Sequence, residues 1–269
     1  MAQFGKRSPL LLFFILAYGI SWILCLPLVI SQRGLGWIQA DVLFEFIVPG
    51  AFAPTIAALL VQRLKEGNFR IARLVSSPRR FMVGIGAGLG IVALGYIAVP
   101  ALAMTTASPA ALHWNAFLSW STYHVNHSTF LGGPVNEEPG WRGFALPQLQ
   151  ARFGPWRPSL LLGVLWAGWH LPLFLVRGWA GLPVWAYVLL VSGFSVVMTF
   201  GANRSGFNII VYVLMHALFN TSSRLLGGLL TDNSLRTNST LVYVVSSLVV
   251  PLALIVATRG KIGARHGCH

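Results

Sequence analysis

Two glutamates stand side by side in the stretch Asn136-Glu137-Glu138-Pro139-Gly140-Trp141-Arg142-Gly143-Phe144, although the whole chain of 269 residues holds only six acidic residues. Hydrophobic segments flank this stretch on both sides. A charged side chain within a bilayer costs at least about 2.5–3.5 kcal/mol, so acidic residues in such surroundings mark functional sites. Arg142 follows Glu138 by four residues, one helical turn along, and can form an ion pair with it. Glu137 is the carboxylate that lacks an obvious partner.

The composition predicts an integral membrane protein of the cell membrane. Hydrophobic residues make up 55% of the chain and charged residues 9%, whereas a soluble domain carries about 25% charged residues. The net charge of +13 would suggest a nucleic-acid partner in a soluble protein. Here Lys and Arg flank hydrophobic segments, where they contact anionic lipid headgroups at the cytoplasmic face. Membrane lipid is therefore an expected partner and nucleic acid is not.

Working outward from the glutamates, long apolar runs predict an all-α transmembrane bundle of about eight spans. The run Pro49-Gly50-Ala51-Phe52-Ala53-Pro54-Thr55 predicts a kink in the second span. Because only short loops join the spans, we expect a single domain over residues 1–269, with a motif core at about 130–223. The spans are expected at about 9–30, 42–62, 81–104, an interrupted region at 115–152, 158–176, 183–201, 206–223 and 239–257.

The interrupted region carries the glutamate pair. One helical piece is expected over 115–131, with His124, Asn126 and His127 forming a polar patch, before Gly132-Gly133-Pro134 breaks it. A second piece is expected from Asn136 to Arg152, with Asn136 as N-cap and Pro139 in the first turn. The pair would then stand at a helix start at membrane depth. Such a broken helix is tolerated only where it lines a cavity enclosed by protein.

The distribution of Lys and Arg predicts the orientation of the bundle. With a cytoplasmic N-terminus, 15 of the 19 basic residues fall on or towards the cytoplasmic side. The four on the other side are Arg33, Arg177, Arg224 and Arg236. The positive-inside rule therefore favours eight spans with both termini cytoplasmic. The tryptophans expected in the interfacial belts are Trp37, Trp179 and Trp185.

Polar residues from three predicted helices converge on one level. Three pairs are spaced by four residues and so share a helix face: Glu138 with Arg142, Trp166 with His170, and His216 with Asn220. At a rise of about 1.5 Å per residue from the cytoplasmic end, Glu137 lies roughly 22 Å deep and His170 roughly 18 Å. His216 and Asn220 lie roughly 15 and 21 Å deep. A buried site formed by these groups is therefore expected.

These residue types suit the attack of water on an amide. A carboxylate and an imidazole can share the activation of water and the protonation of the leaving amine. A second imidazole and a carboxamide can donate hydrogen bonds to the oxygen of a tetrahedral intermediate. Zinc bound by Glu137, His170 and His216 is the alternative, since two His and one Glu with an open position form a hydrolase site. It ranks second because the sequence holds no His-Glu-x-x-His motif, so no cofactor is the first expectation.

The three motifs resemble those of a known family. Glu137-Glu138-x-x-x-Arg142, Trp166-x-x-x-His170 and His216-x-x-x-Asn220 are similar to the motifs of the CPBP family of intramembrane glutamic endopeptidases. This family includes the type 2 CAAX prenyl proteases (Rce1-like) and bacterial proteins of the abortive-infection type. The run Trp169-His170-Leu171-Pro172 adds to the likeness. One departure is Trp166, since the family usually has phenylalanine at this position.

The resemblance implies an eight-helix bundle with a conical cavity that opens to the cytoplasm. It implies that Glu137 and His170 activate water and that His216 and Asn220 form the oxyanion hole. The expected structural supports are Glu138, Arg142 and Trp166. The substrate would be a peptide or protein, lipidated or embedded in the membrane; prenylated CAAX substrates belong to the eukaryotic enzymes, and this chain is more similar to the bacterial members.

Two other functions remain open from the sequence. A non-catalytic protein on the same scaffold, such as a self-immunity factor or a regulator that binds a partner, would not need the complete set of four polar residues. A proton-coupled transporter could use Glu and His as a relay, but no repeated half is visible in the sequence. The intact motifs favour the endopeptidase.

Overall fold

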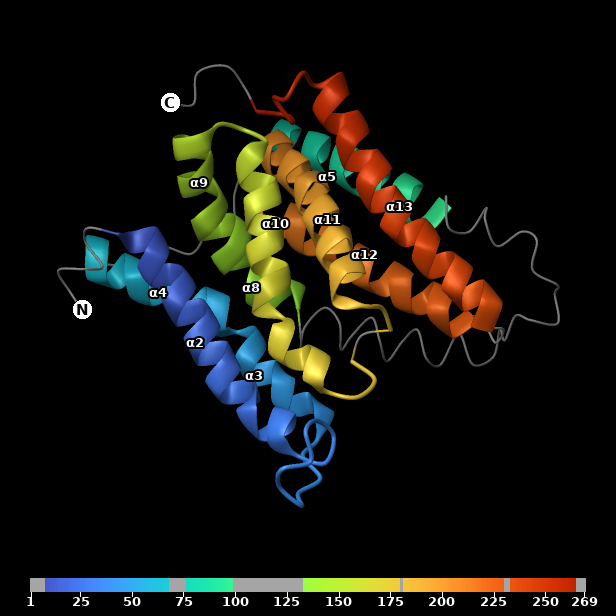
Figure 1. The fold of residues 1–269 in the computed structure, drawn as a ribbon. Coiled ribbons are helices and arrows are strands. Elements are labelled where there is room, and N and C mark those ends of the chain that lie inside the picture. The colour runs from blue at the N-terminus through green and yellow to red at the C-terminus, as the bar shows by residue number, and fades with distance from the viewer. Residues whose placement is uncertain (1–7, 68–75, 99–132, 180, 230–232, 265–269) are drawn as a thin grey trace.

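The computed structural model describes residues 8–67, 76–98, 133–179, 181–229 and 233–264, and within these ranges every regular element is a helix (Figure 1). The predicted all-α class is confirmed. In chain order the elements are α2 (Pro9–Ile30), η1 (Phe44–Phe46), α3 (Ile47–Ala51), α4 (Ala53–Glu66), α5 (Pro78–Ala93), η2 (Leu94–Ala98), α8 (Pro134–Gly140), η5 (Trp141–Ala145), α9 (Leu146–Phe153), α10 (Arg157–Trp169), η6 (Leu171–Leu175), α11 (Val184–Ser205), α12 (Ile209–Leu229) and α13 (Asn233–Ala257).

Three of these helical stretches are long and apolar enough to cross a membrane: Pro9–Ile30, Pro78–Ile97 and Val184–Ser205. The shorter apolar helical stretches are Ile209–Ser222 and Leu241–Ala257. The count of eight spans and the cytoplasmic location of the termini remain predictions. The piece predicted over 115–131, with His124, Asn126 and His127, lies outside the described residues.

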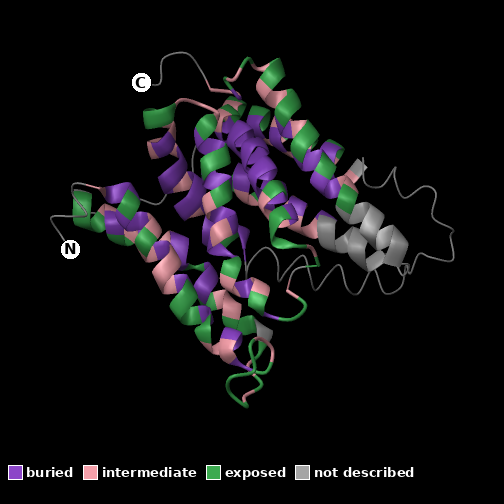
Figure 2. Cartoon of the chain, in the orientation of Figure 1, coloured by how far each residue is buried: buried purple, intermediate pink, exposed green. Residues whose placement is uncertain are grey.

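Helix α11 lies at the centre of the bundle, and its residues are mostly buried (Figure 2). It packs against α5, α10 and α13. Small residues bring the backbones together: a methyl group added at Gly193 would lie 1.7 Å from the carbonyl oxygen of Ser247 on α13. One added at Gly163 on α10 would lie 2.5 Å from the Cα atom of Ser192. Close packing of this kind stabilises helix pairs in membranes, where lipid tails are as apolar as the side chains.

The predicted kink in the second span is confirmed. Helix α3 ends at Ala51 and α4 begins at Ala53, with Pro54 in its first turn. Helix α4 then packs against α2 on one side and α8 on the other. The hydroxyl of Thr55 donates to the carbonyl oxygen of Asn136 at 2.5 Å. Gly140 permits the close contact, because a methyl group there would lie 2.4 Å from the backbone of Pro54.

The helix that carries the glutamates starts two residues earlier than expected. Helix α8 begins at Pro134 after Gly133, and Asn136 lies in its first turn, so the prediction of Asn136 as N-cap is wrong. Proline is well suited to the first helical position because it lacks an N–H and its φ is already helical. The N–H groups of Asn136 and Glu137 both donate to the Gly133 carbonyl. Pro139 consequently lies inside the helix and not in its first turn.

A π-helical segment, η5, joins α8 to α9 without interrupting the helical path. The N–H of Leu146 donates to the carbonyl of Trp141, five residues back. Pro139 and Pro147 lie on either side of this wide turn, and each lacks the N–H that an α-helix would use. Single π turns occur mostly inside α-helices and often at functional sites.

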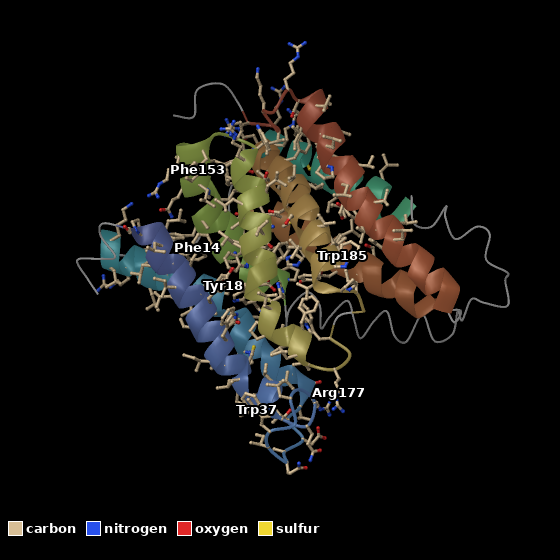
Figure 3. The ribbon with its side chains drawn as sticks, in the orientation of Figure 1. Phe14, Tyr18, Trp37, Phe153, Arg177 and Trp185 are labelled. Atoms are coloured by element: carbon tan, nitrogen blue, oxygen red, sulfur yellow. The ribbon has the colours of Figure 1, made fainter. Side chains whose placement is uncertain are left out.

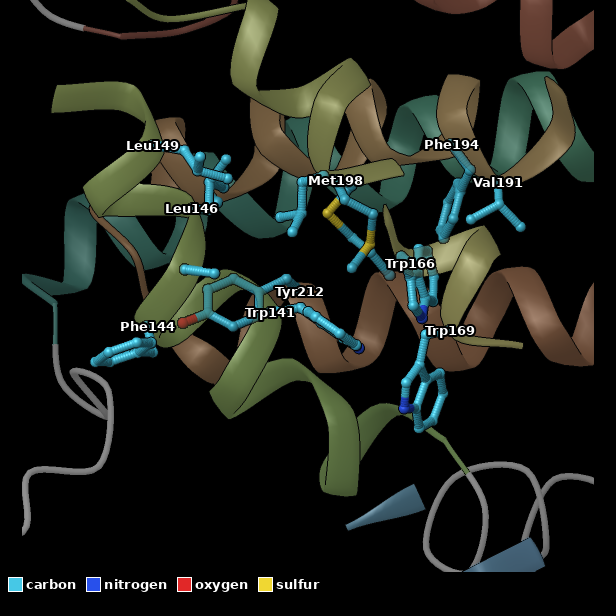
Figure 4. Close-up of a cluster of buried hydrophobic side chains, with 14 of the residues drawn as sticks. Trp141, Phe144, Leu146, Leu149, Trp166, Trp169, Val191, Phe194, Met198 and Tyr212 are labelled. Carbon is cyan, nitrogen blue, oxygen red and sulfur yellow. The ribbon is translucent and has the colours of Figure 1, made fainter. Parts of the chain in front are cut away.

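A cluster of buried hydrophobic side chains, several of them aromatic, includes Trp166 of the second motif (Figure 4). The Trp141 ring is fully buried and packs edge to face against Phe13 of α2 and Trp169 of α10. Phe194 of α11 stacks on Phe219 of α12 at 3.9 Å between ring centroids. Residues from five helices thus hold α8 and α10 in fixed positions relative to α11 and α12.

The two ends of the bundle differ in their side chains. One end holds the start of α5, the start of α12 and the end of α11, since Ser76 bonds Asn208 and Gly206 contacts Arg80. The other end carries Trp37 and Arg177, and Trp185 also lies exposed (Figure 3). Trp37 is 74% exposed and Trp185 65%, in keeping with an interfacial position.

Candidate active site

Glu138 forms the ion pair that its spacing predicts. Its Oε1 accepts a hydrogen bond from Arg142 Nη1 at 3.0 Å, and both side chains are fully buried. The same oxygen also accepts from Nδ1 of His216 at 2.8 Å, a contact that sequence spacing did not indicate. Glu138 therefore connects the first motif to the third, across the interface between α8 and α12.

The guanidinium of Arg142 contacts side chains of three other helices, α8, α10 and α11. Besides Glu138, its Nη2 donates to the hydroxyl of Ser195 on α11 at 3.3 Å. Its guanidinium carbon lies 4.2 Å from the ring centroid of Trp166, and a cation over an indole face is attractive, more so when both are desolvated. Arg142 therefore joins η5 to α8, α10 and α11 through these contacts; its role as a structural support stays a prediction.

Glu137 has a partner in the second motif. Its Oε2 accepts a hydrogen bond from the indole Nε1–H of Trp166 at 2.7 Å. The Glu137 side chain is buried, with 4% of the residue exposed. It also interacts electrostatically with His216. The carboxylate that lacked a partner in the sequence is thus fixed in orientation, with Oε1 not engaged by this bond.

His170 is positioned by the way α10 ends. The predicted span 158–176 is wrong in its boundary, because α10 stops at Trp169 and the 3₁₀ segment η6 follows. Pro172 disfavours an α conformation for the residue before it. The N–H of His170 bonds to the Ala167 carbonyl and so leaves the Trp166 carbonyl without its usual partner. That carbonyl instead lies 2.8 Å from Nδ1 of His170.

This contact fixes the tautomer of His170. A carbonyl oxygen only accepts, so Nδ1 of His170 carries the proton and donates it. In the neutral ring, Nε2 then has a free lone pair. His170 is therefore arranged to accept a proton or a hydrogen bond through Nε2.

Aromatic rings enclose the outer side of His170. Trp179 stacks on the imidazole, with 5.4 Å between centroids and 28° between planes, and Tyr187 approaches at 5.5 Å edge to face. The loop after η6 places the half-buried Trp179 ring against the site; its place in an interfacial belt stays a prediction. A stacked indole excludes water from that face of the imidazole.

His216 is held by the carboxylate of Glu138. The carboxylate accepts, so Nδ1 of His216 donates. The imidazole lies nearly perpendicular to the Trp166 ring, with 4.9 Å between ring centroids and 85° between ring planes. Because Nδ1 is already a donor, Nε2 can donate to an oxyanion only when the ring is doubly protonated.

Asn220 follows His216 by one turn of α12 and is half-buried. The two residues therefore share a helix face, as their spacing predicts. His170 also interacts electrostatically with His216. The helices α8, α10 and α12 thus bring the predicted polar residues into one region of the protein interior.

The zinc alternative requires three ligand side chains that can reach one metal ion. Within the described side chains, no group of three His, Cys, Asp or Glu residues is arranged so that it could hold a metal ion. The Nδ1 atoms of His170 and His216 bond a carbonyl and a carboxylate, which are the partners that commonly orient metal-binding histidines. The zinc alternative with Glu137, His170 and His216 therefore remains a prediction for chelation to test.

Several contacts at the site were not predicted from the sequence. They involve Ser195, which accepts from Arg142, and Tyr18 and Trp22 of α2, which donate to the carbonyls of Leu165 and Trp169 near the end of α10. A lone serine or tyrosine in an apolar span carries no spacing signal. Only the packing of α2 and α11 against α10 shows their role.

Comparison with known proteins supports the motif interpretation. Residues 127–222 match the sequence profile described as Type II CAAX prenyl endopeptidase Rce1-like. A relative named CAAX prenyl protease 2 from Methanococcus maripaludis is 31% identical over 101 residues, which cover 34% of this chain and 36% of the relative. The match thus spans about a third of the length of this curated relative.

The matched region includes all three motifs. The resemblance that the motifs predicted is therefore confirmed in this region. Over residues 127–222 the chain is similar to the Rce1-like type II CAAX prenyl endopeptidases.

Proposed function

We propose that this chain is an endopeptidase that hydrolyses peptide bonds of membrane-associated peptides or proteins. One observation carries the proposal: Trp166 contacts Glu137 through its indole N–H, His170 through its carbonyl and His216 through its ring. Trp166 thus contacts three groups of the proposed reaction: the general base Glu137, the water-binding His170 and the oxyanion donor His216.

In the first step a water molecule lies between Glu137 and His170. Oε1 of Glu137 takes one proton from the water, and Nε2 of His170 accepts a hydrogen bond from the other. The water oxygen attacks the scissile carbonyl carbon, and the carbonyl π pair moves to the oxygen. Doubly protonated His216 and the carboxamide of Asn220 donate hydrogen bonds to the resulting oxyanion.

In the second step the tetrahedral intermediate collapses. Protonated Glu137 returns its proton to the leaving nitrogen, the carbonyl re-forms, and the C–N bond breaks. The products are an amine and a carboxylic acid, and the acid releases its proton to solvent. Glu137 is then again a carboxylate, so the cycle needs no residue beyond the four that are proposed.

The substrate class follows from the surroundings of the site. The polar groups lie among buried apolar residues, so a peptide must reach them from the membrane or its surface. An apolar segment or an attached lipid group would favour such entry. The proposed substrate is therefore a membrane-embedded or lipidated peptide, with a prenylated C-terminus as one form to test.

Removal of the Glu137 carboxylate tests the proposal most directly. Glu137→Gln is expected to lower kcat/KM for peptide cleavage by about a hundred-fold or more, because general-base catalysis contributes about 10²–10⁴-fold. His170→Ala is expected to act in the same direction. The matched control is Glu45→Gln, which removes an exposed carboxylate and is expected to retain activity. The assay uses purified protein in lipid nanodiscs with a library of fluorogenic peptides.

The outcomes separate the alternatives. Cleavage by Glu137→Gln at the wild-type rate would make the assignment wrong. Loss of activity with a chelator, restored by zinc, would establish the metal-dependent version. A folded wild-type protein that cleaves none of the peptides would favour the non-catalytic immunity or regulatory function.

A further inference from the structure

Trp166 makes a different kind of contact with each motif. Its N–H bonds Oε2 of Glu137 at 2.7 Å, and its ring face lies 4.2 Å from the guanidinium carbon of Arg142. Its ring lies in edge-to-face contact with the imidazole of His216, and its carbonyl accepts a hydrogen bond from Nδ1–H of His170. The residue is buried, with 3% exposed. Three of these four contacts need only an aromatic ring or a backbone carbonyl.

The fourth contact needs an indole. Phenylalanine, the usual residue of the resembling family at this position, would supply the ring but not the N–H. A buried carboxylate without donors is costly, whereas a hydrogen bond to an ionised acceptor is about twice as strong as one between neutral groups. In this chain the indole therefore supplies Glu137 with a donor that a phenyl ring could not.

We propose that Trp166 is a positioning residue for Glu137: its indole N–H holds Oε2 and leaves Oε1 as the oxygen that takes the proton from water. The inference rests on the proposed function. The hydrogen bond is compatible with both protonation states, because Oε2 accepts as a carboxylate oxygen and also as the carbonyl oxygen of the acid. Trp166 keeps the carboxyl plane fixed throughout the cycle.

Trp169 offers a matched comparison on the same helix. It is also buried, and its indole N–H donates to the backbone carbonyl of Ala17 on α2 at 3.2 Å. Trp166→Phe and Trp169→Phe each remove one buried indole N–H from α10 and keep an aromatic ring. The two changes differ in the acceptor that loses its donor. In Trp166→Phe this acceptor is the carboxylate of the proposed base, Glu137, and in Trp169→Phe it is the backbone carbonyl of Ala17.

The first measurement compares kcat and KM of these variants in nanodiscs. Trp166→Phe is expected to lower kcat by about 10–100-fold, the rate equivalent of one charge-assisted hydrogen bond. Its KM and thermal midpoint are expected to stay close to those of Trp169→Phe. Equal losses of kcat in both variants, or full kcat in Trp166→Phe, would overturn the inference. A merely structural role of the indole N–H would lower kcat to the same extent in Trp166→Phe and Trp169→Phe.

The second measurement does not depend on activity. The indole N–H resonance of Trp166 is identified in ¹⁵N-labelled protein as the one absent from Trp166→Phe. In Glu137→Gln this resonance is expected to shift, since an amide oxygen is a weaker acceptor than a carboxylate, while that of Trp169 stays in place. An unmoved Trp166 resonance refutes the inference even if the wild type is an active protease. A shifted resonance in a protein that cleaves no peptide supports the hydrogen bond and leaves the proposed function as the part that failed.

Discussion

At the scale of single residues, Glu138 differs most from its expected role. The sequence assigned it to Arg142 alone, but its Oε1 also accepts from His216. A carboxylate that accepts from Nδ1 of an imidazole fixes the orientation of the ring. Glu138 therefore affects both the packing of η5 and the direction in which Nε2 of His216 points.

Glu138→Gln tests this double role. The change leaves the buried guanidinium of Arg142 without its counter-ion, and breaking a buried ion pair in this way costs about 3–5 kcal/mol. We expect lower thermal stability in detergent and lower kcat for peptide cleavage.

The double variant Glu138→Gln with Arg142→Met separates the effect of the unpaired Arg142 charge from the loss of the carboxylate that holds His216. Removing both partners leaves no unpaired cation, so the double variant is expected to be more stable than Glu138→Gln alone, yet still impaired in kcat because His216 lacks its carboxylate. A double variant as active as wild type would contradict the role of Glu138 in holding His216.

Spacing predicted the contacts within a helix but not those between helices. Glu138 and Arg142 are one turn apart, so their pairing follows from helix geometry. The bond between His216 and Glu138 joins residues 78 positions apart, and the bond between Trp166 and Glu137 joins residues 29 apart. Estimates of depth placed these groups at one level but could not determine which atoms meet, because that depends on helix rotation.

At the scale of elements, hydrophobic runs located the helices better than they located the helix ends. The first span agrees with α2, and the Pro49–Pro54 kink falls between α3 and α4. The run that includes His170 stayed apolar to residue 176, although the backbone leaves the α conformation at Trp169. Hydropathy cannot detect that change, whereas Pro172 gave the relevant local signal.

The contact between α8 and α4 provides a prediction at this scale. Gly140→Ala would place a methyl group 2.4 Å from the backbone of Pro54, so α8 has to move away from α4. We expect a cost of about 1–3 kcal/mol, typical of an overpacked core, and a loss of kcat because Glu137 moves with α8. The variant is compared by thermal unfolding and by peptide cleavage.

Gly86→Ala is the matched control. Gly86 lies on α5, and a methyl group there would have no neighbour within 4 Å. Alanine is favoured over glycine within a helix by about 0.5–1 kcal/mol, so this variant is expected to be at least as stable as wild type and fully active. If the two glycine variants behave alike, the contact between α8 and α4 does not determine the position of the glutamates.

At the scale of the whole molecule, charge separates the two ends of the bundle. The start of α2 and the ends of α9, α11 and α13 lie towards the same side (Figure 1). That side carries exposed basic residues such as Arg79, Arg152 and Arg204. The opposite loop carries the ion pair of Arg33 with Asp41 and the exposed Trp37. The basic residues named here thus lie at one end of the bundle, and the positive-inside rule predicts that this end faces the cytoplasm.

Single cysteines test that orientation. In a background with Cys25→Ser and Cys268→Ser, Gln39→Cys is expected to react with a membrane-impermeant maleimide in intact cells. Arg152→Cys is expected to react only after the membrane is permeabilised. Both parent residues are exposed, so a difference in labelling reports the side of the membrane. The reverse pattern would mean that the basic end faces outward.

The direction in which the glutamates of α8 point depends on the number of residues in the π turn η5. A π turn amounts to one residue added to an α-helix, and each residue of an α-helix corresponds to about 100° of rotation. Deletion of Gly143 or Phe144 would keep every motif residue and would turn α8 by about 100° relative to α9. We expect such a chain to lose the contacts of Glu137 with Trp166 and of Glu138 with His216, so the site depends on the number of residues in this turn as well as on the motif residues.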